Sequence, residues 1–127
     1  MIRFLPLLLL MAAIFYLSHS PGENLPPLFS GADKLCHLAA YGALAGSVIF
    51  ALRPRYQGRS SGRLALTGVI FCLLHGISDE IHQMFIPGRT PSLADIGADT
   101  LGAALISGAW LLTQGRQPGR NPMASDN

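Results

Sequence analysis

The chain has 127 residues, enough for one domain, and its composition is that of a membrane protein. Charged residues make up 13% of it, against about 25% in soluble domains, and the mean hydropathy is +0.38. The polar residues are gathered between long apolar runs, which predicts an all-α protein that crosses the lipid bilayer several times. A net charge of +2, without a basic stripe or a phosphate-cradling glycine loop, argues against a nucleic-acid partner.

The first predicted span covers residues 4–20 and carries Pro6 in its first turns, where a helix tolerates proline best. Its apolar core, residues 4–17, is short for a membrane crossing, which takes about 20 residues. Arg3 before this core and the small residues Ser18 and Ser20 also fit a signal peptide, so cleavage is an alternative. Residues 20–27 are predicted to form an ordered connector.

The second predicted span, residues 33–52, begins with a polar ridge. Asp33, His37 and Tyr41 are spaced by four and therefore share one helix face. Asp33 also suits a cap at the positive end of the helix dipole, and His37 and Tyr41 suit hydrogen bonds between helices. Gly42 and Gly46 are spaced to allow close approach of a neighbouring helix.

The loop at residues 53–63 contains arginines and no acidic residue. Short loops rich in Lys and Arg face the cytoplasm, and Arg3, Arg116 and Arg120 should lie on the same side. An even number of crossings satisfies this pattern. The prediction is a four-transmembrane-helix bundle with both termini cytoplasmic.

The third predicted span, residues 64–86, passes from an apolar run into a cluster of ionisable residues. His75, Asp79 and His82 share one helix face, Gln83 lies beside it, and Glu80 is one turn from Gln83. A charge at bilayer depth costs about 2.5–3.5 kcal/mol, so these groups are expected to act together. Pro87 and Gly88 are predicted to stop the helix.

The fourth predicted span covers residues 93–112. Ser92 suits its N-cap, and Asp95 three residues later resembles a capping box. Asp95 and Asp99 share one face, and Ala98 with Gly102 forms a second small-residue pair. Residues 1–114 are thus predicted to form the membrane domain, and residues 115–127 a disordered cytoplasmic tail.

This topology brings the unusual polar residues to one end of the bundle. They occupy the start of the second span, the end of the third and the start of the fourth, all on the outer side. The sequence therefore predicts an outward-facing ligand pocket built from Asp33, His37, Tyr41, Asp79, Glu80, His82, Gln83, Arg89, Asp95 and Asp99.

Three motifs in order resemble the VanZ-like family. They are Asp33-Lys-x-x-His37-x-x-x-Tyr41, Asp79-Glu80-x-x-Gln83-x-x-x-Pro87-Gly-Arg89, and Ser92-x-x-Asp95-x-x-x-Asp99-Thr-Leu-Gly102. The resemblance covers about residues 4–112 and implies a multipass protein of the bacterial cytoplasmic (inner) membrane. It marks Asp33, His37, Glu80, Gln83, Arg89 and Asp95 as shared positions. It also implies a link to cell-envelope function and to low-level antibiotic resistance of the teicoplanin type.

Three classes of function are compatible with the pocket. It could bind a cell-wall precursor or another lipid-linked amphiphile, with Arg89 engaging a phosphate or carboxylate. It could catalyse a reaction on a lipid-linked substrate, with His37 or Glu80 as general base. It could be a structural cluster that joins helix ends. Binding is preferred, because ionisable residues at membrane depth point first to a function and no nucleophile motif supports an enzyme.

No cofactor and no metal are predicted. A zinc site would draw on His37, His82 and either Asp79 or Glu80, but the chain lacks the His-Glu-x-x-His spacing. The oligomeric state is left open.

Two contacts can also be predicted. Cys36 and Cys72 should differ in depth by about 15 Å, too far for a disulfide, so both thiols are expected to be free. Arg89 is expected to pair with Asp95 or Glu80, because cations are scarce at the outer end.

Overall fold

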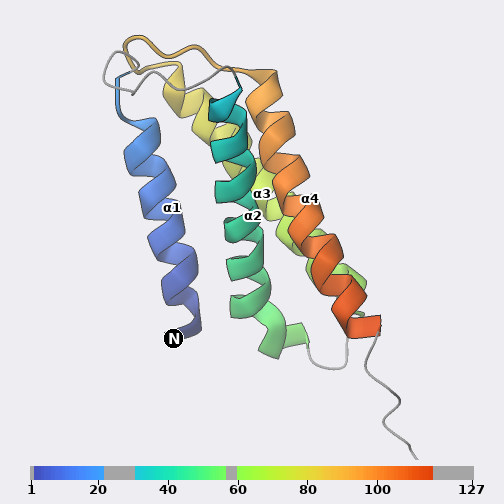
Figure 1. Ribbon diagram of the computed structural model, residues 1–127. Helices are drawn as coiled ribbons and strands as arrows, with labels where there is room; N and C mark the ends of the chain where they lie inside the picture. The colour runs from blue at the N-terminus through green and yellow to red at the C-terminus, as the bar shows by residue number, and fades with distance from the viewer. Residues whose placement is uncertain (1, 22–30, 57–59, 116–127) are drawn as a thin grey trace, which may run out of the picture.

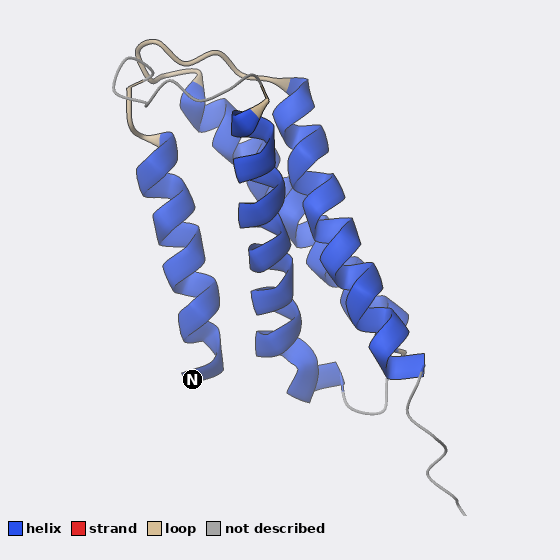
Figure 2. Ribbon diagram, in the orientation of Figure 1, coloured by secondary structure: helices blue, strands red, loops and turns tan. Residues whose placement is uncertain are grey.

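The computed structural model of the protein describes residues 2–21, 31–56 and 60–115, which contain helices and no strand (Figure 2). The elements are η1 (Ile2–Phe4), α1 (Leu5–Ser18), α2 (Ala32–Leu52), η3 (Arg53–Tyr56), α3 (Ser61–Gln83) and α4 (Leu93–Gly115). Three segments are long and apolar enough to cross a membrane, namely Ala32–Tyr56, Ser61–Gln83 and Leu93–Gln114, while Ile2–Ser18 is a shorter apolar helix. The predicted all-helical architecture is confirmed.

The four α-helices alternate in direction (Figure 1). α1 and α3 run toward the end of the bundle where residues 84–92 connect α3 to α4, and α2 and α4 run back. The start of the chain and the end of α4 therefore lie at the same end of the bundle. The end that carries residues 84–92 is called the polar end below.

The helices α3 and α4 differ slightly in their bounds from the approximate third and fourth spans expected from the sequence. α3 covers Ser61–Gln83, against the expected 64–86, so the α-helix ends before it reaches Pro87. The N–H of Met84 still bonds to Glu80, and a tight turn then joins Ile86 to Arg89. α4 continues to Gly115 instead of ending at 112. The predicted tail lies almost wholly outside the described residues, as does most of the connector at residues 20–27.

The closest helix contact joins α2 to α4 through glycine. A Cβ atom on Gly42 would lie 3.0 Å from Ile106 and 3.3 Å from the carbonyl oxygen of Gly102. A Cβ atom on Gly102 would overlap the backbone carbonyl of Leu38. The predicted role of Gly42 and Gly102 in close approach is thereby confirmed, since only a missing side chain lets the two backbones meet.

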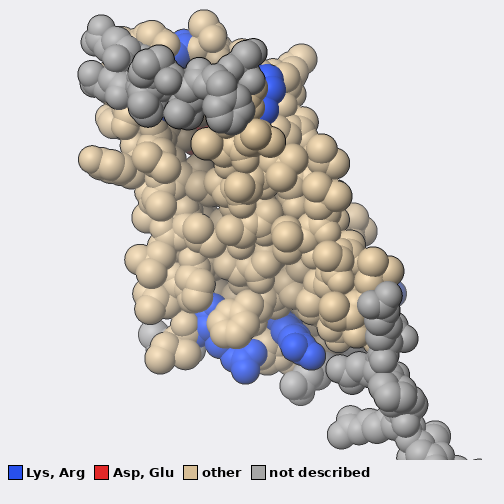
Figure 3. Space-filling view, in the orientation of Figure 1, with Lys and Arg blue, Asp and Glu red and all other residues tan. Residues whose placement is uncertain are grey.

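Apolar residues form both the core and the outer wall of the bundle. Leu44, Val48, Cys72 and Ala103 are fully buried in the middle, where α1 adds Leu7 and Ile14. The wall exposes large side chains such as Leu8, Phe50 and Leu101, as a helix in lipid does. On the front of the molecule, the described Lys and Arg side chains appear toward the two ends, and the surface between them is uncharged (Figure 3).

The two cysteines are free, as predicted. Cys36 is exposed in the first turn of α2, and Cys72 is buried in the middle of α3.

We expect Gly102→Ala to destabilise the protein by about 1–3 kcal/mol, because the added methyl must push the backbones of α2 and α4 apart. Gly108→Ala on the same helix is the matched control, since a Cβ atom there meets nothing within 4 Å. Thermal unfolding in detergent would compare the two variants. Equal midpoints would show that the close α2–α4 contact does not limit stability.

Candidate functional site

Asp79 joins α3 to α1 at the polar end. Its Oδ2 accepts hydrogen bonds from the Ser18 hydroxyl at 2.7 Å and from the Gln83 amide at 3.2 Å. All three side chains are buried. A buried carboxylate is costly unless it is hydrogen-bonded, so these donors are what makes the position of Asp79 tolerable.

Glu80 joins α3 to the start of α4. Its Oε2 accepts the backbone N–H of Ser92 at 2.6 Å, while the Ser92 hydroxyl accepts the N–H of Asp95 at 3.3 Å. The predicted N-cap at Ser92 is confirmed. In a capping box the returning carboxylate comes from the helix itself, but here Glu80 of α3 supplies it.

His37 and Asp99 link α2 to α4 one turn deeper. His37 Nδ1 donates to Asp99 Oδ1 at 2.9 Å, and Asp99 is completely buried. A Cβ atom on Gly76 would lie 2.7 Å from Asp99 Oδ2, so only glycine on α3 leaves room for this carboxylate. The pair fixes the orientation of the imidazole and leaves Nε2 as its free nitrogen.

Lys34 pairs with two of the carboxylates at this end, one on its own helix and one on α4. Its ammonium lies 2.8 Å from Asp33 Oδ2 and 3.1 Å from Asp95 Oδ1. Asp33 is exposed and lies in the first turn of α2 without capping the helix. The sequence placed Lys34 beside Asp33 but did not indicate that it reaches α4.

The predicted pairing of Arg89 with Asp95 or Glu80 was wrong. Among the described residues Arg89 forms no ion pair, and its Nη2 and Nε donate to the backbone carbonyls of Leu17 and Ser20, at 3.0 and 3.2 Å. The Ile86–Arg89 turn, with Gly88 at φ 72°, carries the side chain to the end of α1 instead. A cation there bonds carbonyls at the C-terminal end of α1, where the helix dipole is negative, in addition to the N–H of Ser20 that Leu17 already accepts.

Histidines occupy the edges of the site. The Tyr41 hydroxyl lies 3.1 Å from His75 Nδ1, and His19 Nδ1 lies 3.2 Å from His82 Nε2. His82 thus faces α1, where its ring also packs on Phe15. Ser18, His19 and His75 were not among the residues predicted to line the pocket. His75 carried a signal, because it shares a helix face with Asp79.

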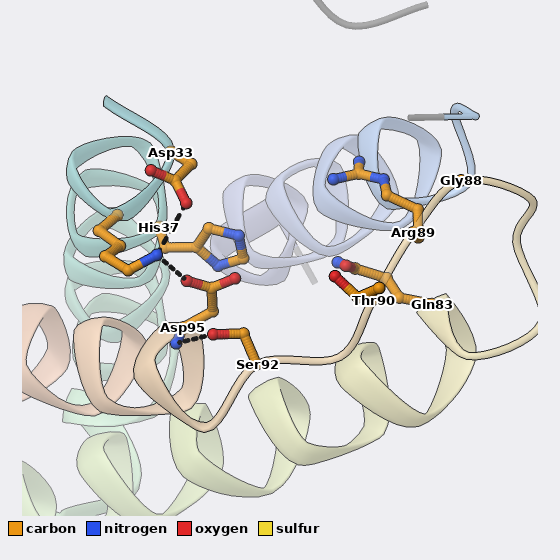
Figure 4. Close-up of a pocket in the computed structure, with 9 residues that line it drawn as sticks. Asp33, His37, Gln83, Gly88, Arg89, Thr90, Ser92 and Asp95 are labelled. Atoms are coloured by element: carbon orange, nitrogen blue, oxygen red, sulfur yellow. Dashed lines mark hydrogen bonds and ion pairs between the residues drawn. The ribbon is translucent and has the colours of Figure 1, made fainter. Parts of the chain in front are cut away.

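Two cavities open among these residues. The larger has a volume of about 390 Å³ and is lined by Asp33, Lys34, His37, Gln83, Gly88, Arg89, Thr90, Ser92 and Asp95. In it, Arg89 and Gln83 face His37 and Asp95 across the opening (Figure 4). The smaller, about 140 Å³, is mainly apolar and is lined by Ile14, Leu17, Ser18, Cys36, His37, Ala40, Tyr41 and Asp79. His37 borders both.

The predicted pocket residues thus divide into groups. Five of them line the larger cavity: Asp33, His37, Gln83, Arg89 and Asp95. Tyr41 and Asp79 line the smaller one, with His37. Glu80 and Asp99 bond to residues of the larger cavity from behind, and His82 lies apart against α1. Whether these residues bind a ligand stays a prediction.

The zinc set considered from the sequence is not brought together, because Asp79 and His82 turn toward α1. The structure brings a different set of possible metal ligands together. His37, Glu80 and Asp95 each place one potential ligand atom within 4.8 Å of the others.

Comparison with known proteins gives one family. The family model described as VanZ/LLP1 matches residues 3–114, nearly all of the described chain. No curated protein and no solved structure matches the chain significantly.

We expect Arg89→Ala to loosen the end of α1, because the carbonyls of Leu17 and Ser20 lose a charged donor. Such hydrogen bonds contribute about 1.5–3 kcal/mol. Hydrogen exchange in detergent should accelerate in the last turn of α1 and stay unchanged in the middle of α4. Arg63→Ala, at the opposite end of the bundle, is the control. Uniform acceleration in both helices would contradict a local capping role.

Proposed function

We propose that this chain, which belongs to the VanZ/LLP1 family of membrane proteins, binds the anionic headgroup of a cell-envelope or lipid-linked amphiphile at its polar end. The observation that carries the proposal is the cavity of about 390 Å³, which has Lys34 and Arg89 in its lining. This volume falls within the range of small-molecule sites, roughly 300–1,000 Å³.

Arg89 has donors to spare for an anion. The two hydrogen bonds to α1 use only part of the five N–H groups of a guanidinium. They also hold the planar group in place, so less rotamer entropy is lost when it binds a phosphate or carboxylate. Gln83, Thr90 and Ser92 add polar groups to the same lining.

The smaller cavity supports an amphiphilic ligand. It is apolar, adjoins the larger cavity at His37 and lies among α1, α2 and α3. A headgroup in the polar cavity would have an apolar surface beside it for the first part of a hydrocarbon chain. A purely water-soluble anion would leave this surface unused.

The charge pattern supports an outward-facing pocket in a bacterial inner membrane. Arg53, Arg55 and Arg63 flank the short connection at the end opposite the pocket. Because short loops rich in Arg stay in the cytoplasm, both termini are then cytoplasmic as well.

A second candidate function is catalysis on a lipid-linked precursor. The hydrogen bond between His37 and the buried Asp99 favours it, because a general base is commonly oriented by such a partner. Turnover of a polyprenyl-linked substrate, lost in His37→Gln, would distinguish catalysis from binding alone.

We also propose that the protein affects susceptibility to teicoplanin-type antibiotics, as the family resemblance implies. It can be tested by comparing teicoplanin susceptibility of one bacterial strain with and without the expressed chain.

We expect a reporter that is active only in the cytoplasm to be active when fused after Asn127. The same reporter inserted after Thr90 should be inactive, because residues 84–92 connect α3 to α4 outside the membrane in this topology. The opposite pair of results would place the pocket on the cytoplasmic side.

We expect the purified protein in nanodiscs to bind a polyprenyl phosphate, and Arg89→Lys to weaken binding by about tenfold, because lysine cannot form the bidentate contact. Arg63→Lys, far from the cavity, should bind normally. Inorganic phosphate and phosphatidylglycerol serve as comparison ligands. Tighter binding of either would change the ligand class, and equal binding by both Arg variants would exclude the cavity as the site.

A further inference from the structure

We propose that His37, Glu80 and Asp95 form a binding site for a divalent cation of the zinc class at the inner wall of the larger cavity. One potential ligand atom from each residue lies within 4.8 Å of the other two. The three residues come from α2, α3 and α4, so the site exists only in the folded bundle.

Each of the three side chains is held through one atom and keeps another free. His37 donates its Nδ1–H to Asp99, Glu80 Oε2 accepts the N–H of Ser92, and Asp95 Oδ1 accepts from the Lys34 ammonium. No described residue bonds to the remaining atoms, which are Nε2 of His37, Oε1 of Glu80 and Oδ2 of Asp95. Metal-binding histidines are held in this way, with the second ring nitrogen donated to a carboxylate.

Glu80 supplies an independent sign of a missing partner. The residue is 3% exposed, and its Oε1 is fully buried without a hydrogen-bond partner among the described residues. A buried carboxylate oxygen without a partner is costly, about 1–3 kcal/mol or more. Neither Lys34 nor Arg89 bonds to it, because they are committed to Asp33, Asp95 and the end of α1.

The charge balance of the polar end favours a further cation. The carboxylates in the described part of the chain are all here: Asp33, Asp79, Glu80, Asp95 and Asp99. The only described Lys or Arg side chains at this end are Lys34 and Arg89. A protonated His37 would still leave the carboxylates in excess, and a divalent ion would reduce that excess where it is most buried.

The ligand types point to zinc rather than calcium or magnesium. One imidazole with two carboxylates suits a borderline ion, whereas Ca²⁺ and Mg²⁺ prefer oxygen alone. With metal–ligand distances of about 2.0–2.2 Å, tetrahedral ligand atoms lie about 3.4 Å apart. The observed separations therefore need to shorten by at most about 1.4 Å, within reach of side-chain rotation.

Three protein ligands would leave a coordination position open. His37 and Asp95 line the larger cavity, so an anion bound there could complete the site. Metal binding is nevertheless a separate property from the proposed ligand binding, because it can be measured with the ion alone.

The test is a titration with Zn²⁺ of the purified full chain in detergent, after treatment with a chelator. Calorimetry measures the binding, and thermal unfolding measures the change in the unfolding midpoint. We expect one Zn²⁺ per chain and a higher midpoint, because the ion binds the folded state. Glu80→Gln should bind Zn²⁺ at least about 100-fold more weakly, since even changes outside the ligand shell cost 10–100-fold. Its amide oxygen can still accept the Ser92 N–H, which preserves the start of α4.

Asp33→Asn is the matched control, because it removes a nearby exposed carboxylate that is not part of the triad. It should bind Zn²⁺ within about threefold of the unaltered chain. Equal weakening in both variants would show diffuse attraction to acidic groups and overturn the proposal. So would unchanged binding in Glu80→Gln, absence of saturable binding, or Ca²⁺ and Mg²⁺ binding as tightly as Zn²⁺.

Discussion

The close approach of α2 and α4 is the constraint on which the polar end depends. Gly102 meets the backbone of Leu38 with no room for a side chain. His37 precedes Leu38, and Asp99 lies one helical turn before Gly102, so the same contact brings imidazole and carboxylate together at 2.9 Å. Gly76 of α3 provides the remaining space beside Asp99. Glycines on two helices, Gly102 of α4 and Gly76 of α3, thus determine where a buried charge can be placed.

Carboxylates then join the helices to one another at this end. Four of the five described carboxylates are bonded by a group from outside their own helix: Asp79 by Ser18, Glu80 by the N–H of Ser92, Asp95 by Lys34, and Asp99 by His37. In an apolar environment such bonds replace hydration that the side chains would have in water. The network therefore stabilises the helix ends and orients side chains around a cavity. The structural and the ligand-binding interpretations of these residues are compatible.

α1 is attached mainly at its two ends. At the polar end, Ser18 bonds to Asp79 and Arg89 caps the helix. At the other end, the Arg3 guanidinium lies over the ring of Phe50 and Arg55 lies over Phe4, at 5.3 and 4.9 Å. Between these ends, Leu7 and Ile14 face the core while Leu8, Leu9 and Phe15 are exposed. The smaller cavity lies beside the last turns of α1, where Ile14, Leu17 and Ser18 line it.

Much of this arrangement could be predicted from the sequence. The length of the apolar runs predicted four helices, and the spacing of the glycines predicted that helices approach one another closely. The spacing of the polar residues predicted which of them gather at one end. These predictions were possible because helix periodicity and the length needed to cross a membrane are properties of the local sequence. The partners were decided only by the tertiary structure. Arg89 was close enough in sequence to pair with Glu80, but the turn at Gly88 carries it to α1, and Lys34 reaches Asp95 instead. The convergence of His37, Glu80 and Asp95 from three helices depends on how those helices pack and rotate, which no local spacing specifies.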